Sequence, residues 1–188
     1  MHCPARGPHE GGMMDAIEAI LARRSIRRFT AEDVSVEDER TLIEAAFAGP
    51  SSGNGRPWHF VVVRDAETRR RLAGVHQWSG LLARAPLVIA VLGRADADAW
   101  VEDGAAAAEN VLTAATALGL GSCWVGVWEN APEPQPAEVT VLEILGTTPE
   151  KYRCLCLIAV GHPADHKPPR TQFQPTKLSY ERVGRHTR

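Results

Sequence analysis

The sequence predicts a single domain in which helices cover a buried β-sheet. Residues 60–63, 87–92 and 152–160 are short, almost unbroken apolar runs, which are typical of strands buried on both faces. Residues 101–118 are rich in alanine and contain few β-branched residues, which favours one long helix that packs closely on its neighbours. A chain of 188 residues fits one domain and can bury roughly 70% of its unfolded surface without disulfides or metals.

Two helices are predicted before the first strand. Residues 14–24 carry apolar side chains at helical spacing, and a β-branched and aromatic stretch follows where the chain leaves the helix. A second helix begins at Ser35, a favourable N-cap followed by acidic residues, and it ends at residues 49–50. The expected buried face of this second helix consists of Leu42, Ile43, Ala46 and Phe47.

Helices and strands alternate through the rest of the chain. Residues 66–75 are predicted to form a charged helix, and residues 123–127 a further strand after two glycines end the long helix. A stiff polar connection that contains Pro132, Pro134 and Pro136 precedes a short helix at residues 139–145. The tail from residue 161 contains several prolines and no strong periodicity, so we expect it to run over a surface, its own or a partner's.

Composition and charge argue against several partners. A net charge of −2 and a pI near 6.4 give no bulk attraction to nucleic acid or to an anionic membrane. Residues 1–12 have no apolar core of a signal peptide and are expected to be a disordered leader, and no later stretch approaches the ~18 apolar residues of a membrane span. We therefore expect a cytoplasmic protein that binds neither nucleic acid nor membrane.

The four cysteines are predicted to be reduced thiols. Cys3, Cys123, Cys154 and Cys156 lack the C-x-x-C spacing of a zinc site or a thioredoxin-like centre. Cys154 and Cys156 lie two apart in a predicted strand, hence on one face, where they read as small buried hydrophobes rather than a redox pair.

The polar segment at residues 23–29, Arg-Arg-Ser-Ile-Arg-Arg-Phe, has the pattern of an anion site. If this arm is extended, Arg23, Ser25 and Arg27 share one face, where two guanidinium forks and a hydroxyl can gather on a phosphate. The alternative is a solvated charge cluster at a helix end. A second polar segment, the loop at residues 50–60, reads Pro-Ser-Ser-Gly-Asn-Gly-Arg-Pro-Trp-His-Phe.

Together these two segments resemble the nitroreductase family of FMN-dependent oxidoreductases. The similarity continues in the same order through residues 103–110, 117–126, 161–163 and 167–170. The resemblance implies an α+β fold with a mixed central sheet flanked by helices, spanning residues 13–188. It also implies an intertwined homodimer in which the C-terminal tail wraps the partner and each of two interface sites holds one FMN.

Site residues are implied by position within the matching motifs. For the FMN phosphate they are Arg23, Ser25 and Arg170, with Lys167 either reinforcing them or simply exposed. Arg24 would act through backbone or ribityl contacts. Arg27 would place a cation near N1 and the C2 carbonyl, where negative charge gathers on reduction.

The flavin ring would be held by two further segments. Pro50, Ser51, Ser52 and Asn54 match the loop that reaches the flavin from the other subunit, whereas Arg56 stands where the family commonly has Gln, so that its contact is open. Trp124, Val125 and Gly126 match the segment along the isoalloxazine, where a glycine permits close approach and a backbone N–H can meet N5. The alternative for these three is an ordinary turn at a strand.

The implied reaction is hydride transfer from NAD(P)H, a transient co-substrate, through FMN to a small acceptor such as a nitroaromatic, quinone or enone. Two alternatives stay open: a family member that consumes its own flavin in a biosynthetic reaction, and a non-enzymatic flavin-binding or flavin-sensing protein. Trp78 and Trp100 either wall the acceptor pocket or pack inward. No G-x-G-x-x-G after a strand, no P-loop and no H-E-x-x-H occurs, so the sequence signals no Rossmann site and no metal centre.

Overall fold

A four-stranded sheet forms the centre of the protein. The structure, a computed structural model, describes residues 14–168 and 172–186. The strands are β1 (Trp58–Val63), β2 (Leu87–Arg94), β3 (Gly121–Gly126) and β4 (Tyr152–Gly161), in the order β1-β2-β4-β3. All three strand pairs are antiparallel, and among the described residues the parallel component is an isolated bridge between Ser25 and Ser122. The expected mixed sheet is therefore antiparallel throughout its four strands.

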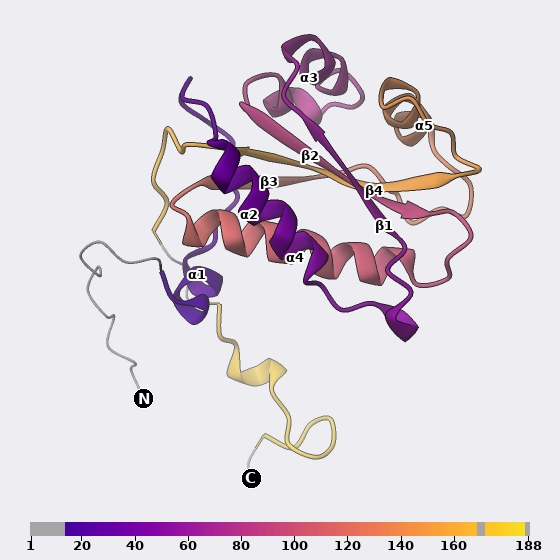
Figure 1. Ribbon diagram of the computed structural model, residues 1–188. Coiled ribbons are helices and arrows are strands. Elements are labelled where there is room, and N and C mark those ends of the chain that lie inside the picture. Colours follow the sequence, from indigo (N-terminus) through magenta and orange to yellow (C-terminus); the bar gives the residue numbers. More distant parts are fainter. Residues whose placement is uncertain (1–13, 169–171, 187–188) are drawn as a thin grey trace.

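Helices cover both faces of this sheet (Figure 1). On one face lie α1 (Ala16–Ala22), α2 (Val36–Phe47) and the long α4 (Trp100–Ala117). On the other face lie α3 (Ala66–Leu72), the 3₁₀ turn η2 (Ser79–Ala83) and α5 (Pro136–Ile144). The apolar core is correspondingly split into two clusters, one on each side of the sheet, because β2 and β4 are buried on both faces. In the described ranges no helix combines the length and apolar character that crossing a bilayer requires.

The predicted elements are present, with shifted ends. Ser35 caps α2 as expected, since its hydroxyl accepts a hydrogen bond from the Asp38 N–H at 3.0 Å. Pro136 does not belong to the stiff connection but begins α5, because its missing N–H costs nothing at the first helical position. The prediction of a buried Phe47 is wrong for the single chain: its side chain is 57% exposed and touches Phe60 edge-on.

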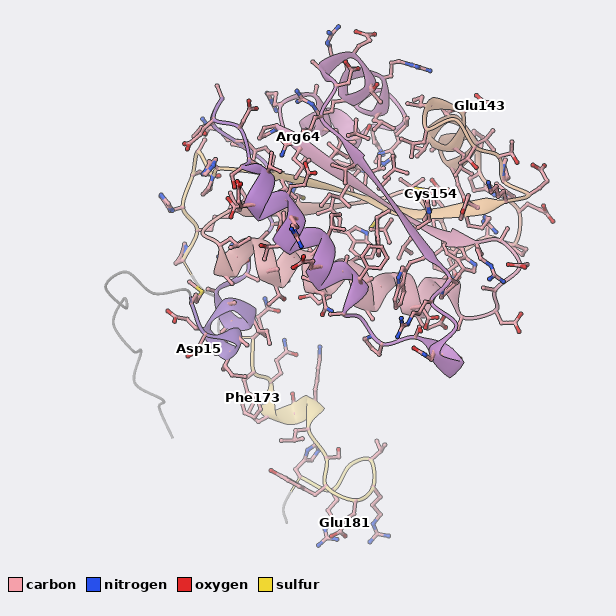
Figure 2. All side chains as sticks on the ribbon, in the orientation of Figure 1. Asp15, Arg64, Glu143, Cys154, Phe173 and Glu181 are labelled. Carbon is pink, nitrogen blue, oxygen red and sulfur yellow. The ribbon has the colours of Figure 1, made fainter. Side chains whose placement is uncertain are left out.

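A β-bulge in β4 corrects the prediction that Cys154 and Cys156 share one face. Along β2 the register passes from Val91 opposite Cys156 to Leu92 opposite Cys154, so Leu155 is an extra residue on β4. An extra residue reverses the alternation of side chains, and the two cysteines therefore enter opposite core clusters. Both are fully buried, as expected of small hydrophobes (Figure 2 shows Cys154 on β4).

The end of the described chain leaves the body of the protein. The yellow segment that contains η3 (Pro175–Lys177) extends away from the sheet and its covering helices (Figure 1), and Figure 2 shows Phe173 and Glu181 along it. Phe173 is 71% exposed and Val183 is 99% exposed. The predicted leader at residues 1–12 lies outside the described residues.

Candidate functional site

The arm after α1 runs beside the edge strand β3. The Ile26 N–H donates to the Ser122 carbonyl at 2.9 Å, and the Thr30 N–H donates to the His162 carbonyl at 2.9 Å. A Cβ on Gly121 would come within 2.7 Å of the Ile26 side chain, so this approach requires glycine at the start of β3. The arm is therefore extended, which is the condition under which Arg23, Ser25 and Arg27 share one face, and its backbone fixes it to the sheet.

A polar cavity of about 140 Å³ opens along this arm. The described residues that line it are Arg23, Arg24, Ser25, Arg27, Lys167 and Gln172. Two of the cations are oriented by backbone carbonyls: Lys167 Nζ donates to the Ser25 carbonyl at 2.7 Å, and the Arg24 guanidinium donates to the Pro168 carbonyl. The described lining contains four cations and no carboxylate, a donor set suited to a phosphate dianion.

Arg23 has a carboxylate neighbour outside the cavity lining. Its Nε lies 3.3 Å from Oε1 of Glu109 on α4. The Arg23 side chain is 31% exposed, so solvent screens this ion pair and its contribution is small. The pair ties the arm to α4 and still leaves most of the guanidinium donors available for a ligand.

Cys123 lies beside the same cations. Burial raises the pKa of its thiol above the ordinary value of 9.0, although Arg27 and Lys167 act in the opposite direction. The residue is 2% exposed. Cys123 is therefore a neutral buried thiol at neutral pH, close to residues that line the cavity.

The outer edge of β3 offers backbone groups next to this cavity. The carbonyls of Ser122 and Gly126 point away from β4, because they accept hydrogen bonds from the Ile26 N–H and from the His76 ring. In an antiparallel ladder the N–H and C=O of one residue point the same way and alternate along the strand. The N–H groups of Trp124 and Gly126 consequently also face outward, beyond the point where the arm covers the edge.

The bulge in β4 determines where β3 ends. The N–H groups of Val127 and Trp128 both donate to the Leu155 carbonyl, at 3.1 and 3.2 Å. Two successive donors on one acceptor turn the chain away from the regular ladder directly after Gly126. The end of β3 is thus a defined turn rather than a frayed strand.

The polar loop at residues 50–57 has an unusual backbone. Gly53, Asn54 and Arg56 all have positive φ angles, of 56°, 57° and 47°. Arg56 holds this shape, because its Nε donates to the Asn54 side-chain oxygen at 2.9 Å and its N–H donates to the Ser51 hydroxyl at 3.1 Å. In the single chain the Arg56 guanidinium therefore orients Asn54, whose amide NH₂ can still turn to a ligand, and a contact of Arg56 with the flavin stays a prediction.

A buried carboxylate anchors the same loop to α4. The Ser52 N–H donates to Asp103 Oδ1 at 2.9 Å, and Asp103 is only 6% exposed. Asp103 lies in the first turn of α4, where the helix dipole favours a negative charge. The sequence block at residues 103–110 matched the family, but no role for this aspartate followed from it.

The arm and the loop lie far apart in one chain. The loop is bound to the first turn of α4, whereas Ile26 of the arm pairs with Ser122 on β3, after the last turn of the helix, and Arg23 reaches Glu109 in the middle of α4. They also lie at opposite edges of the sheet, since the loop leads into β1 and the arm pairs with β3 (Figure 1). One chain therefore brings together the residues of the arm, Lys167 and the β3 edge, but not those of the loop.

Other predicted residues have mixed outcomes. Arg170 lies outside the described residues. Trp100 packs inward, 8% exposed and edge-on to Trp128, whereas Trp78 is 73% exposed. Gln172 and His76 were not foreseen, because an isolated glutamine or histidine carries no spacing signal. In the part of the chain that the structure describes, no group of His, Cys, Asp and Glu side chains could hold a metal ion.

Comparisons with known proteins concern the family and the fold. A model of the nitroreductase family matches residues 20–79 and 75–162. A protein from Methanothermobacter thermautotrophicus, provisionally named an NADH dehydrogenase/NAD(P)H nitroreductase, is 35% identical over 90% of this chain and 88% of its own length.

Two solved structures share the fold. The FMN-dependent nitroreductase from Clostridium difficile R20291 superimposes with a TM-score of 0.82 at 30% identity, covering 88% of this chain and 99% of that one. The NADPH:FMN oxidoreductase from Vibrio harveyi, solved in complex with NAD⁺, gives 0.75 at 27% identity, covering 89% and 77%. With the family model matching well over half of its length, this chain belongs to the nitroreductase family.

Proposed function

We propose that this protein is an NAD(P)H-dependent FMN oxidoreductase that reduces a small acceptor such as a nitroaromatic, quinone or enone. The observation that carries the proposal is the cavity along the arm, whose described lining has four cations and no carboxylate and adjoins an open edge of β3. The FMN and NAD(P)H named for its relatives fit these donors, because a phosphate needs cations and a flavin ring needs in-plane backbone donors and acceptors.

Each segment would hold a different part of FMN. Arg23, Arg24, Ser25 and Lys167 would hold the phosphate and ribityl chain, with Arg170 from the tail. Arg27 would place its charge beside the pyrimidine end of the ring, where negative charge gathers on reduction. The outward backbone groups of the β3 end, at Trp124, Val125 and Gly126, would meet the ring edge.

The loop would complete the site of a second copy. Asn54, Ser51, Ser52 and Pro50 lie at the opposite edge of the sheet from the arm of their own chain, so a homodimer would supply them across the interface. Exposed apolar side chains support such an interface: Ile17, Ile20 and Leu21 on α1, Phe47 on α2, and Phe173 on the tail.

Bound FMN would supply two-electron chemistry, accepting hydride from NAD(P)H and then reducing the acceptor in the same space, in a ping-pong cycle. The side chains described around the site include no evident general acid or base. Their work would be to bind, to orient and to set the electrostatic environment.

The absorbance spectrum of the purified protein, before and after anaerobic addition of NADH or NADPH, tests this proposal. We expect a flavin spectrum that bleaches with at least one donor and returns when a quinone or nitroaromatic is added. Protein that stays colourless after incubation with FMN would refute flavin binding. Bound flavin that neither donor bleaches would indicate a flavin-binding or sensing protein, and destruction of the flavin under oxygen would indicate a flavin-consuming enzyme.

A further inference from the structure

His76 makes two hydrogen bonds that connect the link between α3 and η2 to the end of β3. Its Nδ1 lies 3.1 Å from the Trp78 N–H, which can only donate. Its Nε2 lies 2.9 Å from the Gly126 carbonyl, which can only accept. Both contacts are satisfied by one form of the neutral ring, with the proton on Nε2 and the lone pair on Nδ1. The surroundings therefore select a single tautomer and a single ring orientation.

The backbone beneath the ring is itself fixed. Ser79 is fully buried, and its hydroxyl accepts the His76 N–H at 3.2 Å. The same hydroxyl lies 2.8 Å from the Ala73 carbonyl and 2.6 Å from the His76 carbonyl, so its one proton is shared between these acceptors. The Ser79 N–H in turn donates to the His76 carbonyl at 3.1 Å. His76 thus stands on a rigid turn, not on a mobile link.

The hydrogen bond from His76 to Gly126 lies at the end of β3 that would meet the flavin ring in the proposed site. Gly126 is the last residue of β3, and the bulge at Leu155 turns the chain directly after it. The His76 bond occupies the outward carbonyl of Gly126 and leaves the outward N–H of the same residue for a ligand. Gly126 has no side chain to restrict its φ and ψ angles, so these depend on the pairing of its neighbours with β4 and on the His76 bond to its carbonyl.

We infer that His76 is a positioning residue for the flavin: by binding the Gly126 carbonyl it fixes the φ and ψ angles of Gly126, and with them the direction in which the Gly126 N–H meets the ring edge. This inference rests on the proposed function, since it requires FMN to lie along the β3 edge. Its consequence is specific. Loss of the His76 bond to Gly126 would misalign the ring against the hydride donor while leaving the phosphate contacts of the arm intact.

Two substitutions separate the two bonds of the ring. In His76→Asn the side-chain oxygen stands at the position of Nδ1 and can still accept the Trp78 N–H, but nothing reaches Gly126. In His76→Gln the amide nitrogen is as many bonds from Cα as Nε2 and can restore the donor to Gly126. His59→Asn is a matched control, because His59 lies on β1 and its ring packs against Tyr152 with centroids 5.1 Å apart.

Three quantities are measured on each FMN-loaded protein: the dissociation constant for FMN, the rate constant of anaerobic flavin reduction in single-turnover stopped flow, and the ¹⁵N chemical shift of N5 in labelled FMN. We expect His76→Asn to keep the FMN dissociation constant within about threefold, to slow reduction about fivefold or more, and to move the N5 resonance. His76→Gln should recover the parent values, and His59→Asn should not differ from the parent.

The inference is overturned if His76→Asn matches the parent in N5 shift and reduction rate, if His76→Gln loses as much as His76→Asn, or if His76→Asn loses FMN affinity in proportion to its rate. The last result would indicate a general structural role. Failure of the parent protein to bind FMN is a separate outcome, which refutes the proposed function itself.

Discussion

At the residue scale, the cations of the arm have different surroundings, and these predict different roles. Arg23 touches Glu109 and lines the cavity together with Ser25, so it can bind a phosphate without leaving α4. Arg27 is further along the arm, where it lines the cavity and lies close to the buried thiol of Cys123. Retention of the cofactor and tuning of its potential should therefore be separable by substitution.

We predict that Arg23→Ala weakens FMN binding by about 2 kcal/mol, or roughly thirtyfold, because a partly desolvated cation is removed from a phosphate. Titration of the apoprotein with FMN, followed by quenching of flavin fluorescence, measures the effect. Glu109→Gln is the control: it removes the competing carboxylate and should leave FMN binding unchanged or tighter. Equal affinity in Arg23→Ala and the parent would mean that the arm is a solvated charged face.

Arg27→Gln should retain FMN and lower its two-electron potential. A fixed cation near N1 and the C2 carbonyl favours the reduced state, and loss of about 1.4 kcal/mol corresponds to roughly 30 mV for two electrons. Anaerobic potentiometry at saturating FMN, with Arg23→Ala measured alongside, distinguishes tuning from retention. An unchanged potential in Arg27→Gln would remove Arg27 from the electrostatics of the ring.

At the scale of elements, the shape of the 50–57 loop depends on one carboxylate of α4. Asp103 accepts the Ser52 N–H and is almost fully buried, so its loss leaves a backbone donor without a partner near a loop that already contains three residues with positive φ. The strained backbone needs this anchor to keep one conformation.

Asp103→Ala should therefore loosen the loop and destabilise the protein by about 1–3 kcal/mol, the cost of an unsatisfied buried group. Hydrogen exchange at the Ser52 amide, read together with urea unfolding, measures both effects. Asp103→Asn keeps an oxygen acceptor at the same position and should preserve most of the protection. Full protection of Ser52 in Asp103→Ala would show that the loop is ordered by other contacts.

At the scale of the whole molecule, the separation of the arm from the loop predicts that the active form is a dimer with two shared sites. The parent protein should elute as a dimer that carries FMN. Arg23→Ala and Asn54→Ala homodimers should each bind FMN weakly. The mixed dimer should regain one parent-like site, because one of its two sites combines an intact arm from one subunit with an intact loop from the other. Stoichiometric FMN in a monomer, or no recovery in the mixed dimer, would contradict the shared site.

The buried thiols predict how stability responds to alkaline pH. Burial raises the pKa of Cys123, Cys154 and Cys156 above the ordinary value of 9.0, so the folded state keeps protons that the unfolded state releases. Their contribution is fully present below pH 9.0 and falls as pH rises beyond it, by up to about 1.4 kcal/mol per pH unit for each of Cys154 and Cys156, whose pKa values are raised furthest.

The free energy of unfolding, measured with urea from about pH 7.5 to about pH 10.5, checks this response, because that range brackets the ordinary pKa of a thiol. The Cys156→Ala variant should be less stable at neutral pH because of the cavity, yet it should lose less stability on going to high pH. An equally steep alkaline loss in Cys156→Ala and the parent would assign that loss to other groups.

Short-range patterns were sufficient to predict the helices, the strands and the cations of the arm. Apolar runs, the Ser35 cap and the alanine-rich stretch each act within a few residues, and the extended spacing of Arg23, Ser25 and Arg27 needs only local geometry. The same local reasoning wrongly predicted that Cys154 and Cys156 share one face. The β-bulge that separates them is defined only by the pairing of β4 with β2, which the sequence of β4 alone does not reveal.

Long-range contacts decided the rest. The packing of distant segments decides that Asp103 anchors Ser52. It also decides that Arg56 donates to Asn54, and that Ile26 of the arm and the polar loop lie at opposite ends of α4. The role of His76 is of the same kind, since its partner Gly126 lies 50 residues away along the chain. Side chains of this sort carry no periodic or spacing signal, because the groups that give them a role come together only when the sheet and its helices assemble.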